Sequence, residues 1–234
     1  MPELKIDSDL IEPKEIIPSR DALDLSRIPL VELMRYFGAS SKAGSYSSYY
    51  QWLDEILSKK RRPYTIVEAG TASGASARAF SARFPEAIIY TLDVNPACST
   101  IFRSTPKIIP LTCDISSVEG LSSAFSSIRA PIDVLIDDAS HMSSDVASLL
   151  KFAWNRLAEN FIYIVEDCDS LGNPGYSQHM SAKFSRSECD NRRETFLAII
   201  NDLMHISDQL NDHNYRIKIA YCHKLLIVSR WNDY

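Results

Sequence analysis

The sequence predicts an α/β protein with a doubly wound, mostly parallel sheet, and three observations support this fold class. Apolar runs of strand length alternate with helical patterns from Tyr64 to Val165, an order typical of parallel sheets. Several of these runs end in acidic residues, and the carboxyl ends of parallel strands meet at one edge of a sheet. A length of 234 residues with 45% hydrophobic residues is sufficient for one large domain.

The N-terminal quarter of the chain is expected to be an extended arm followed by a helical cap. Residues 1–20 contain three prolines and several charges, which predicts the arm. Apolar residues at helical spacing predict helices over 21–38 and Tyr46–Leu57, with a loop at 40–45. Tyr46 and Tyr50 lie one helical turn apart, and they either pack in the core of the cap or cover a ligand. The predicted division is an arm and cap at 1–62 and a globular domain at 63–234.

Strands and helices are predicted in alternation after residue 63. Seven strands are expected, at residues 64–69, 87–92, 108–112, 131–136, 161–165, 215–221 and 225–231. Helices are expected before residue 84 and at 117–128, 143–157 and 196–210. The last two strands are separated by only three residues, so they should form an antiparallel hairpin. Residues 170–191 show no periodicity, and a loop of this length is typical of a lid or a substrate loop.

Charge and cysteine content exclude several classes of protein. The formal net charge of −5 gives no basic surface for nucleic acid or for an anionic membrane. The basic run at 59–62 is interpreted as the solvated end of a helix. The five cysteines include no Cys-x-x-Cys pair, which argues against a disulfide scaffold and a structural zinc site. With no N-terminal signal and no apolar run of the ~20 residues that a membrane span needs, we expect a cytoplasmic protein.

Two predicted strands end in pairs of acidic residues. Asp137 and Asp138 end the fourth strand, Glu166 and Asp167 end the fifth, and His141 follows the first pair by three residues. Neighbouring parallel strands bring such carboxylates to one place. Crowded carboxylates repel one another unless a cation joins them, and hard divalent ions bind oxygen ligands of this kind. The sequence therefore predicts a divalent metal site.

A second set of residues predicts a nucleoside pocket at the ends of the first three strands. Asp93 follows the second strand and can bind a pair of ribose hydroxyls, while Asp114 follows the third and can accept from an adenine amino group. The alternative is that these acids only cap the following helices. A turn with the spacing Glu-x-Gly-x-x-x-Gly follows the first strand, where glycine lets the backbone approach a ligand. The candidate contacts in this turn are Glu68, Gly70, Thr71, Ser73 and Gly74.

Together these motifs resemble those of a known enzyme family. The series from Glu68 to Asp114 is similar to class I S-adenosylmethionine-dependent methyltransferases. Asp-Asp-Ala-Ser-His at 137–141 and Tyr-Ile-Val-Glu-Asp at 163–167 resemble the metal-dependent macrocin and mycinamicin O-methyltransferases, with their rhamnosyl O-methyltransferase and cephalosporin-hydroxylase-like relatives. The resemblance covers residues 42–169 well and the final hairpin loosely. It implies a Rossmann-like doubly wound fold, with S-adenosyl-L-methionine and Mg²⁺ as cofactors.

The resemblance also implies a role for each site residue. Asp138, Glu166 and Asp167 would hold the magnesium ion, and His141 would be the general base. A metal ion lowers the pKa of a bound hydroxyl, and a histidine, with a reference pKa of about 6.5, can take the proton. Asp137 would face the cofactor together with the residues of the nucleoside pocket.

The predicted reaction is methylation of a hydroxyl of a sugar or polyol-like small molecule in natural-product biosynthesis. The expected partners are this small acceptor and a second copy of the chain, because relatives self-associate, without nucleic acid or membrane. One alternative is a nicotinamide-dependent oxidoreductase, which the half-matched glycine spacing and the metal cluster disfavour. Another is an inactive cofactor-binding partner protein, which the intact metal and base positions disfavour. Ser140 and His141 could also be a helix N-cap pair.

Overall fold

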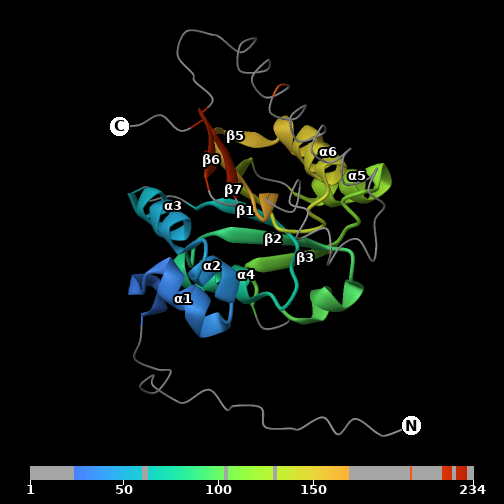
Figure 1. Ribbon diagram of the computed structural model, residues 1–234. Helices are drawn as coiled ribbons and strands as arrows, with labels where there is room; N and C mark the ends of the chain where they lie inside the picture. Colours follow the sequence, from blue (N-terminus) through green and yellow to red (C-terminus); the bar gives the residue numbers. More distant parts are fainter. Residues whose placement is uncertain are drawn as a thin grey trace, which may run out of the picture.

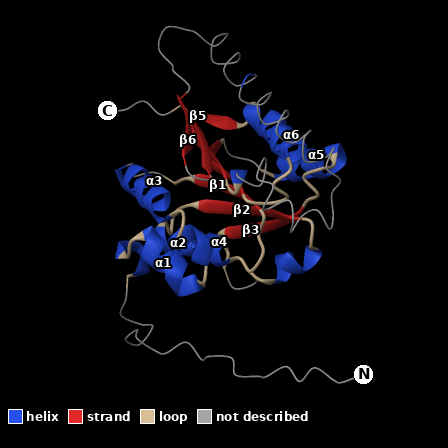
Figure 2. Cartoon of the chain, in the orientation of Figure 1, coloured by secondary structure: helices blue, strands red, loops and turns tan. Residues whose placement is uncertain are grey.

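The chain folds around a mixed β-sheet with helices on both faces (Figure 1, Figure 2). The computed structural model describes residues 24–59, 63–102, 105–128, 131–168, 201, 218–222 and 225–230. Within these residues the sheet has seven strands in the order β3-β2-β1-β4-β5-β7-β6. The strands are β1 Thr65–Ala69, β2 Ile88–Asp93, β3 Ile108–Thr112, β4 Ile132–Asp137, β5 Leu157–Val165, β6 Lys218–Cys222 and β7 Leu225–Ser229.

The order of the strands determines where a ligand site can form. Strands β1 to β5 pair in parallel, whereas β7 pairs antiparallel with both β5 and β6. Strand β1 lies between β2 and β4. The connection after β1 leads to β2 on one side of it, whereas the connection after β3 returns to β4 on its other side, so a crevice forms at the carboxyl end of β1. The predicted mixed α/β fold with an antiparallel C-terminal strand pair is confirmed.

The helices divide between the two faces of the sheet. Figure 1 shows α5 and α6 together on one side, and α1 to α4 on the other. Short 3₁₀ turns occur at η1 Leu25–Arg27 and η2 Pro96–Thr100. None of the helices in the described part of the chain is long and apolar enough to cross a membrane. The α-helices are α1 Leu30–Phe37, α2 Ser40–Ala43, α3 Ser47–Lys59, α4 Ala75–Arg83, α5 Val118–Ser127 and α6 Ser143–Trp154.

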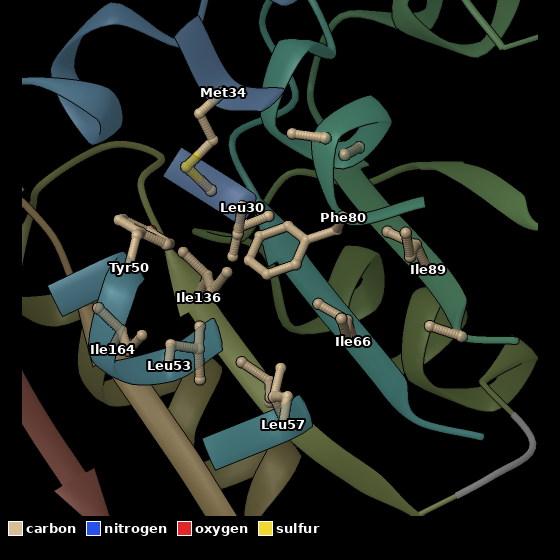
Figure 3. Close-up of a cluster of buried hydrophobic side chains, with 14 of the residues drawn as sticks. Leu30, Met34, Tyr50, Leu53, Leu57, Ile66, Phe80, Ile89, Ile136 and Ile164 are labelled. Atoms are coloured by element: carbon tan, nitrogen blue, oxygen red, sulfur yellow. The ribbon is translucent and has the colours of Figure 1, made fainter. Parts of the chain in front are cut away.

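Each face of the sheet buries its own apolar core, because alternate strand residues point to opposite faces. On the face covered by α3, Tyr50 and Leu53 point toward Ile136 and Ile164 of the sheet (Figure 3). Complete burial of one such aliphatic side chain contributes about 1.5–3 kcal/mol. The N-terminal helices therefore share a hydrophobic core with the sheet.

Three predicted element boundaries are wrong. In the described part of the range 21–38, where one helix was expected, the chain forms the 3₁₀ turn η1 and then α1, which begins after Pro29. The ring of Pro29 removes an N–H donor, and the N–H of Leu30 donates to the Asp54 carboxylate at 2.9 Å. The loop expected at 40–45 contains the short helix α2. The helix expected to end at 157 ends at Trp154, because Leu157 already pairs with β4 as the first residue of β5.

Several predictions lie outside the described residues. They are the arm at 1–20, the loop at 170–191, the helix at 196–210 apart from a helical Asn201, and the strand ends at 215–217 and 231. The division between 1–62 and 63–234 stays a prediction.

Candidate functional site

The turn between β1 and α4 requires glycine at the two predicted positions. Gly70 has φ +92°, and a Cβ atom there would lie 2.0 Å from the carbonyl oxygen of Asp138. Gly74 has φ +72°, and its Cβ would lie 2.4 Å from the ring of Phe102. Any larger residue would clash at both positions and would also strain the backbone. Glycine at position 70 therefore lets the end of β1 approach the end of β4 closely.

Asp93, at the end of β2, holds this turn in place. One carboxylate oxygen accepts the backbone N–H groups of Thr71 and Ala72 at 3.0 and 3.1 Å, and the other accepts that of Asn95 at 2.8 Å. Ala72 has φ +45°, so this bond stabilises a left-handed conformation that a non-glycine residue rarely adopts. Asp114, after β3, accepts the N–H and O–H of Ser116 in a local turn.

A pocket of about 500 Å³ opens at the carboxyl ends of β1 to β4. This volume is in the range of small-molecule sites. Of the predicted cofactor contacts, Gly70, Asp93 and Asp114 line it, together with Asp138 from the predicted metal set. The pocket wall also includes Cys113, and burial raises the pKa of its thiol to about 11, so the thiol is a packing group and not a nucleophile.

The other predicted cofactor contacts lie around the pocket and not on its wall. Thr71 and Gly74 are buried in the turn, whereas Ser73 is exposed. Glu68 is buried, accepts the Ser76 hydroxyl at 2.6 Å, and has a pKa raised by burial. Asp137 is also buried, and burial raises its pKa to about 6 despite a 3.2 Å bond from the Tyr163 hydroxyl.

Asp138, His141 and Asp167 converge beside the pocket. One ligand atom from each lies within 4.8 Å of the others. The His141 Nε2 atom is 3.7 Å from Asp167 Oδ2 and 4.0 Å from Asp138 Oδ1. Oxygen ligands on opposite sides of a magnesium ion lie about 4.2 Å apart, since each Mg–O bond is about 2.1 Å. The three side chains are therefore grouped on the scale of a divalent-cation site, with the two carboxylates as its candidate oxygen ligands.

Two of these three residues have unusual backbone conformations. His141 has φ +55° and Asp167 has φ +53°, values that cost about 1–3 kcal/mol for non-glycine residues and cluster at functional sites. The Ser140 hydroxyl fixes the loop that carries His141, because it donates to Asp145 at 2.6 Å and accepts the Met142 N–H at 3.3 Å. Met142 is the N-cap residue of α6, so His141 does not cap that helix.

Glu166, the third predicted metal ligand, points toward the N-terminal helices. Its Oε1 atom accepts hydrogen bonds from the Lys42 ammonium at 2.8 Å and from the Tyr50 hydroxyl. Its Oε2 atom is buried and has no hydrogen-bond partner among the described residues. Burial raises the pKa of Glu166, although the Lys42 charge opposes this shift.

Lys42 is the site residue that sequence reasoning missed. Its ammonium is buried between three carboxylates, 2.6 Å from Asp138, 2.8 Å from Glu166 and 3.6 Å from Glu68. Burial alone would lower the pKa of Lys42, but these three acids raise it above its usual value, so the amine stays charged. A signal was present in the sequence, because Lys42 precedes Tyr46 by four residues, the same interval that separates Tyr46 from Tyr50.

The structure supports the core-packing interpretation of the two tyrosines, and the interpretation that they cover a ligand stays a prediction. Tyr46 and Tyr50 are buried in the core that α3 shares with the sheet. Their hydroxyl groups nevertheless reach the predicted metal site, since Tyr46 donates to Asp167 and Tyr50 donates to Glu166.

Comparison with known proteins places this site in context. No family model matches the sequence. The 8-demethyl-8-alpha-L-rhamnosyl tetracenomycin-C 2'-O-methyltransferase of Streptomyces olivaceus is 26% identical over 144 residues, which are 58% of this chain and 37% of that protein. The MycE methyltransferase of the mycinamycin pathway, in a structure with Mg and SAH, aligns with a TM-score of 0.67 and 21% identity over 87% of this chain and 55% of its own. The chain has a class I methyltransferase fold.

Two further structures support this fold assignment. MycE in complex with Mg, SAH and mycinamycin VI aligns with a TM-score of 0.67 and 20% identity over 87% of this chain and 54% of its own. A caffeoyl-CoA O-methyltransferase homologue from Staphylococcus aureus aligns over 86% of this chain and 92% of its own, with a TM-score of 0.54 and 13% identity. The resemblance predicted from the motifs is confirmed. This chain spans about half the length of MycE and little more than a third of the Streptomyces relative.

Proposed function

We propose that this protein is a magnesium-dependent S-adenosylmethionine O-methyltransferase that methylates a hydroxyl of a sugar or polyol-like small molecule in natural-product biosynthesis. The observation that carries the proposal is the convergence of Asp138, His141 and Asp167 beside a pocket whose turn requires glycine. The Streptomyces relative and the MycE structures with Mg, SAH and mycinamycin VI support the reaction class and a small-molecule acceptor.

The donor atoms of the site fit the proposed ion. Magnesium prefers oxygen ligands in an octahedral arrangement. Asp138 and Asp167 would supply two carboxylate oxygens. Glu166 lies outside the group of converging ligand atoms, but its Oε2 atom is buried and has no partner among the described residues, and we assign it as a third ligand that turns toward the ion when the ion binds. Because nitrogen is a poor ligand for a hard cation, His141 would remain beside the ion as a base. The predicted roles of Asp138, Glu166, Asp167 and His141 are retained in this proposal.

The chain's own residues account for the remaining steps. When bound, S-adenosylmethionine supplies an electrophilic methyl group and the ion acidifies the acceptor hydroxyl. His141 accepts the hydroxyl proton at Nε2, which lies 3.7 Å from an Asp167 oxygen and 4.0 Å from an Asp138 oxygen. Asp93 holds the glycine turn open for the cofactor, and with Asp114 it offers acceptors at the pocket wall.

Calorimetry with S-adenosylhomocysteine, NAD⁺ and Mg²⁺ tests the cofactor assignment. We expect saturable binding of S-adenosylhomocysteine and of Mg²⁺, and none of NAD⁺. Binding of NAD⁺ in place of S-adenosylhomocysteine would favour the oxidoreductase alternative. Methyl transfer from labelled cofactor to a panel of rhamnosides, other glycosides and polyols tests the acceptor class. We expect EDTA to abolish the transfer and added Mg²⁺ to restore it, and undiminished turnover in EDTA would refute the role of the metal.

Self-association is a separate prediction. Light scattering on the purified protein measures the molar mass, which a dimer or larger assembly would raise above the 26.4 kDa of one chain.

A further inference from the structure

Three hydrogen-bond donors lie at equal intervals along the N-terminal helices. They are Lys42, Tyr46 and Tyr50, each four residues from the next, and all three are buried. The helical path is interrupted between α2 and α3, because Gly44, at the end of α2, has φ −101° and ψ −94°, and the Tyr46 N–H donates to the Ser41 carbonyl five residues earlier at 3.2 Å. The three side chains nevertheless reach acids of the same site. We call Lys42, Tyr46 and Tyr50 the row.

The side chains of the row donate hydrogen bonds to one oxygen of each of the three acids of the proposed metal site. Lys42 donates to Asp138 Oδ2 and Glu166 Oε1, at 2.6 and 2.8 Å. Tyr50 donates to the same oxygen of Glu166, and Tyr46 donates to Asp167 Oδ1. Each acid is thus held through one of its two oxygens.

The second oxygen of each acid is directed elsewhere. Asp138 Oδ1 and Asp167 Oδ2 face His141 Nε2, at 4.0 and 3.7 Å. Glu166 Oε2 is buried without a partner among the described residues. A carboxylate that is fixed through one oxygen cannot rotate freely, so the orientation of its other oxygen is determined as well.

We propose that Lys42, Tyr46 and Tyr50 are positioning residues that hold one oxygen of each acid and present the other oxygen to a divalent cation. This inference deepens the proposed function, because it assumes the same metal site. Partners that orient ligands in this way typically change metal affinity by about 10- to 100-fold when they are removed. The row differs from a purely structural contact, because its loss should weaken metal binding in a protein that remains folded.

Metal binding by the unliganded protein tests the row without reference to turnover. Mn²⁺ binding is followed by electron paramagnetic resonance, and Mg²⁺ binding by competition. Tyr46→Phe and Tyr50→Phe each remove one hydroxyl and no charge, and we expect each to weaken Mn²⁺ binding about tenfold. Tyr36→Phe is the matched control, since Tyr36 is 54% exposed on α1, and its affinity should equal that of the wild type. Wild-type affinity in both core variants, with native circular dichroism, would overturn the proposal.

Lys42→Arg tests whether position or charge matters at Lys42. Arginine keeps the positive charge, but its planar fork cannot take the place of the compact ammonium between Asp138 and Glu166. We expect weaker Mn²⁺ binding, and wild-type affinity in a folded Lys42→Arg protein would remove Lys42 from the row. If Lys42→Arg does not fold, the two tyrosine variants still decide the question.

The same titration separates this proposal from the proposed function. A wild-type protein that binds no divalent cation would refute the metal requirement and the row together. A wild-type protein that binds Mn²⁺, with variants of equal affinity, would overturn the row alone.

Discussion

The two halves of the candidate site are held together by different kinds of contact. The cofactor half is built locally: backbone N–H groups of the β1–α4 turn are fixed by Asp93, about one α/β unit away in the sequence. The metal half is built from side chains far apart in the chain, since Lys42 and Glu166 are separated by 124 residues. Changes in the first half should therefore affect folding and cofactor affinity, and changes in the second should affect metal affinity and turnover.

The largest expected effect is at the metal half. His141→Ala removes the proposed base, and loss of a positioned general base typically lowers the rate by about 10²- to 10⁴-fold. Single-turnover methyl transfer to an accepted glycoside measures this step. S-adenosylhomocysteine affinity, measured by calorimetry, should stay unchanged, because His141 does not line the pocket in the described part of the chain. A near-native rate would remove His141 from the mechanism.

The next effect is at the cofactor half and concerns stability. Gly70→Ala would place a Cβ atom 2.0 Å from the Asp138 carbonyl oxygen at φ +92°, so we expect a loss of more than about 4 kcal/mol in the free energy of unfolding. Gly38→Ala is the control: Gly38 has φ +90° but nothing within 4 Å of the added atom, so only backbone strain of about 1 kcal/mol applies. Urea denaturation measures both values, and equal losses would show that the close approach to β4 is not what requires glycine.

A pH-dependent effect is expected at Asp137, the last residue of β4. Asp137 has its pKa raised from 3.8 to about 6 by burial, so between pH 4 and 6 the folded protein keeps a proton that the unfolded chain has lost. Stability from this group is therefore present below pH 4 and falls as the pH rises to 6, by about 3 kcal/mol. Asp137→Asn removes this dependence, and its free energy of unfolding relative to wild type should increase over that window. Parallel curves for the two proteins in urea titrations at pH 4 to 7 would contradict the assignment.

The smallest expected effect is a change in cofactor affinity alone, and it tests most directly whether the two halves are independent. Asp93→Asn keeps the shape of the side chain but weakens its bonds to the Thr71 and Ala72 N–H groups. We expect S-adenosylhomocysteine to bind about tenfold more weakly, which corresponds to one charge-assisted hydrogen bond. Mn²⁺ affinity should remain at the wild-type value, the reverse of the pattern expected for Tyr46→Phe. A parallel loss of both affinities would show that the two halves are not independent.

The local character of the cofactor half explains why its position in the fold could be inferred from the sequence, whereas the binding roles of its residues stay predictions. Strand-end acids and a glycine turn are determined by a few neighbouring residues, and Gly70, Asp93 and Asp114 lie on the pocket wall as the spacing indicated. Glu68 and Asp137 do not line the pocket in the described residues, because neighbouring strand residues alternate in direction. Membership of an acid pair does not by itself reveal which acid faces the ligand.

The metal half was only partly predictable, because it depends on contacts between parts of the chain that are far apart in the sequence. Asp138 and Asp167 converge with His141 as expected, but the direction of the Glu166 side chain depends on Lys42 and Tyr50. These contacts exist only after the N-terminal helices pack against the sheet. The short helix α2, which carries Lys42, was itself predicted as a loop, so the position of its ammonium could not be inferred.

The burial of Lys42 has a consequence for the order of folding. Lys42 is synthesised long before Asp138 and Glu166, so until β4 and β5 have formed, Glu68, at 3.6 Å, is the only one of its three acidic neighbours that has been made. Placing an unpaired ammonium in an apolar interior costs several kcal/mol. Closure of the N-terminal helices over the sheet is therefore stabilised fully only when the chain has been made as far as Glu166. Pairings so distant in sequence slow folding, and they make docking of the first helices a late step in which the whole domain becomes stable together.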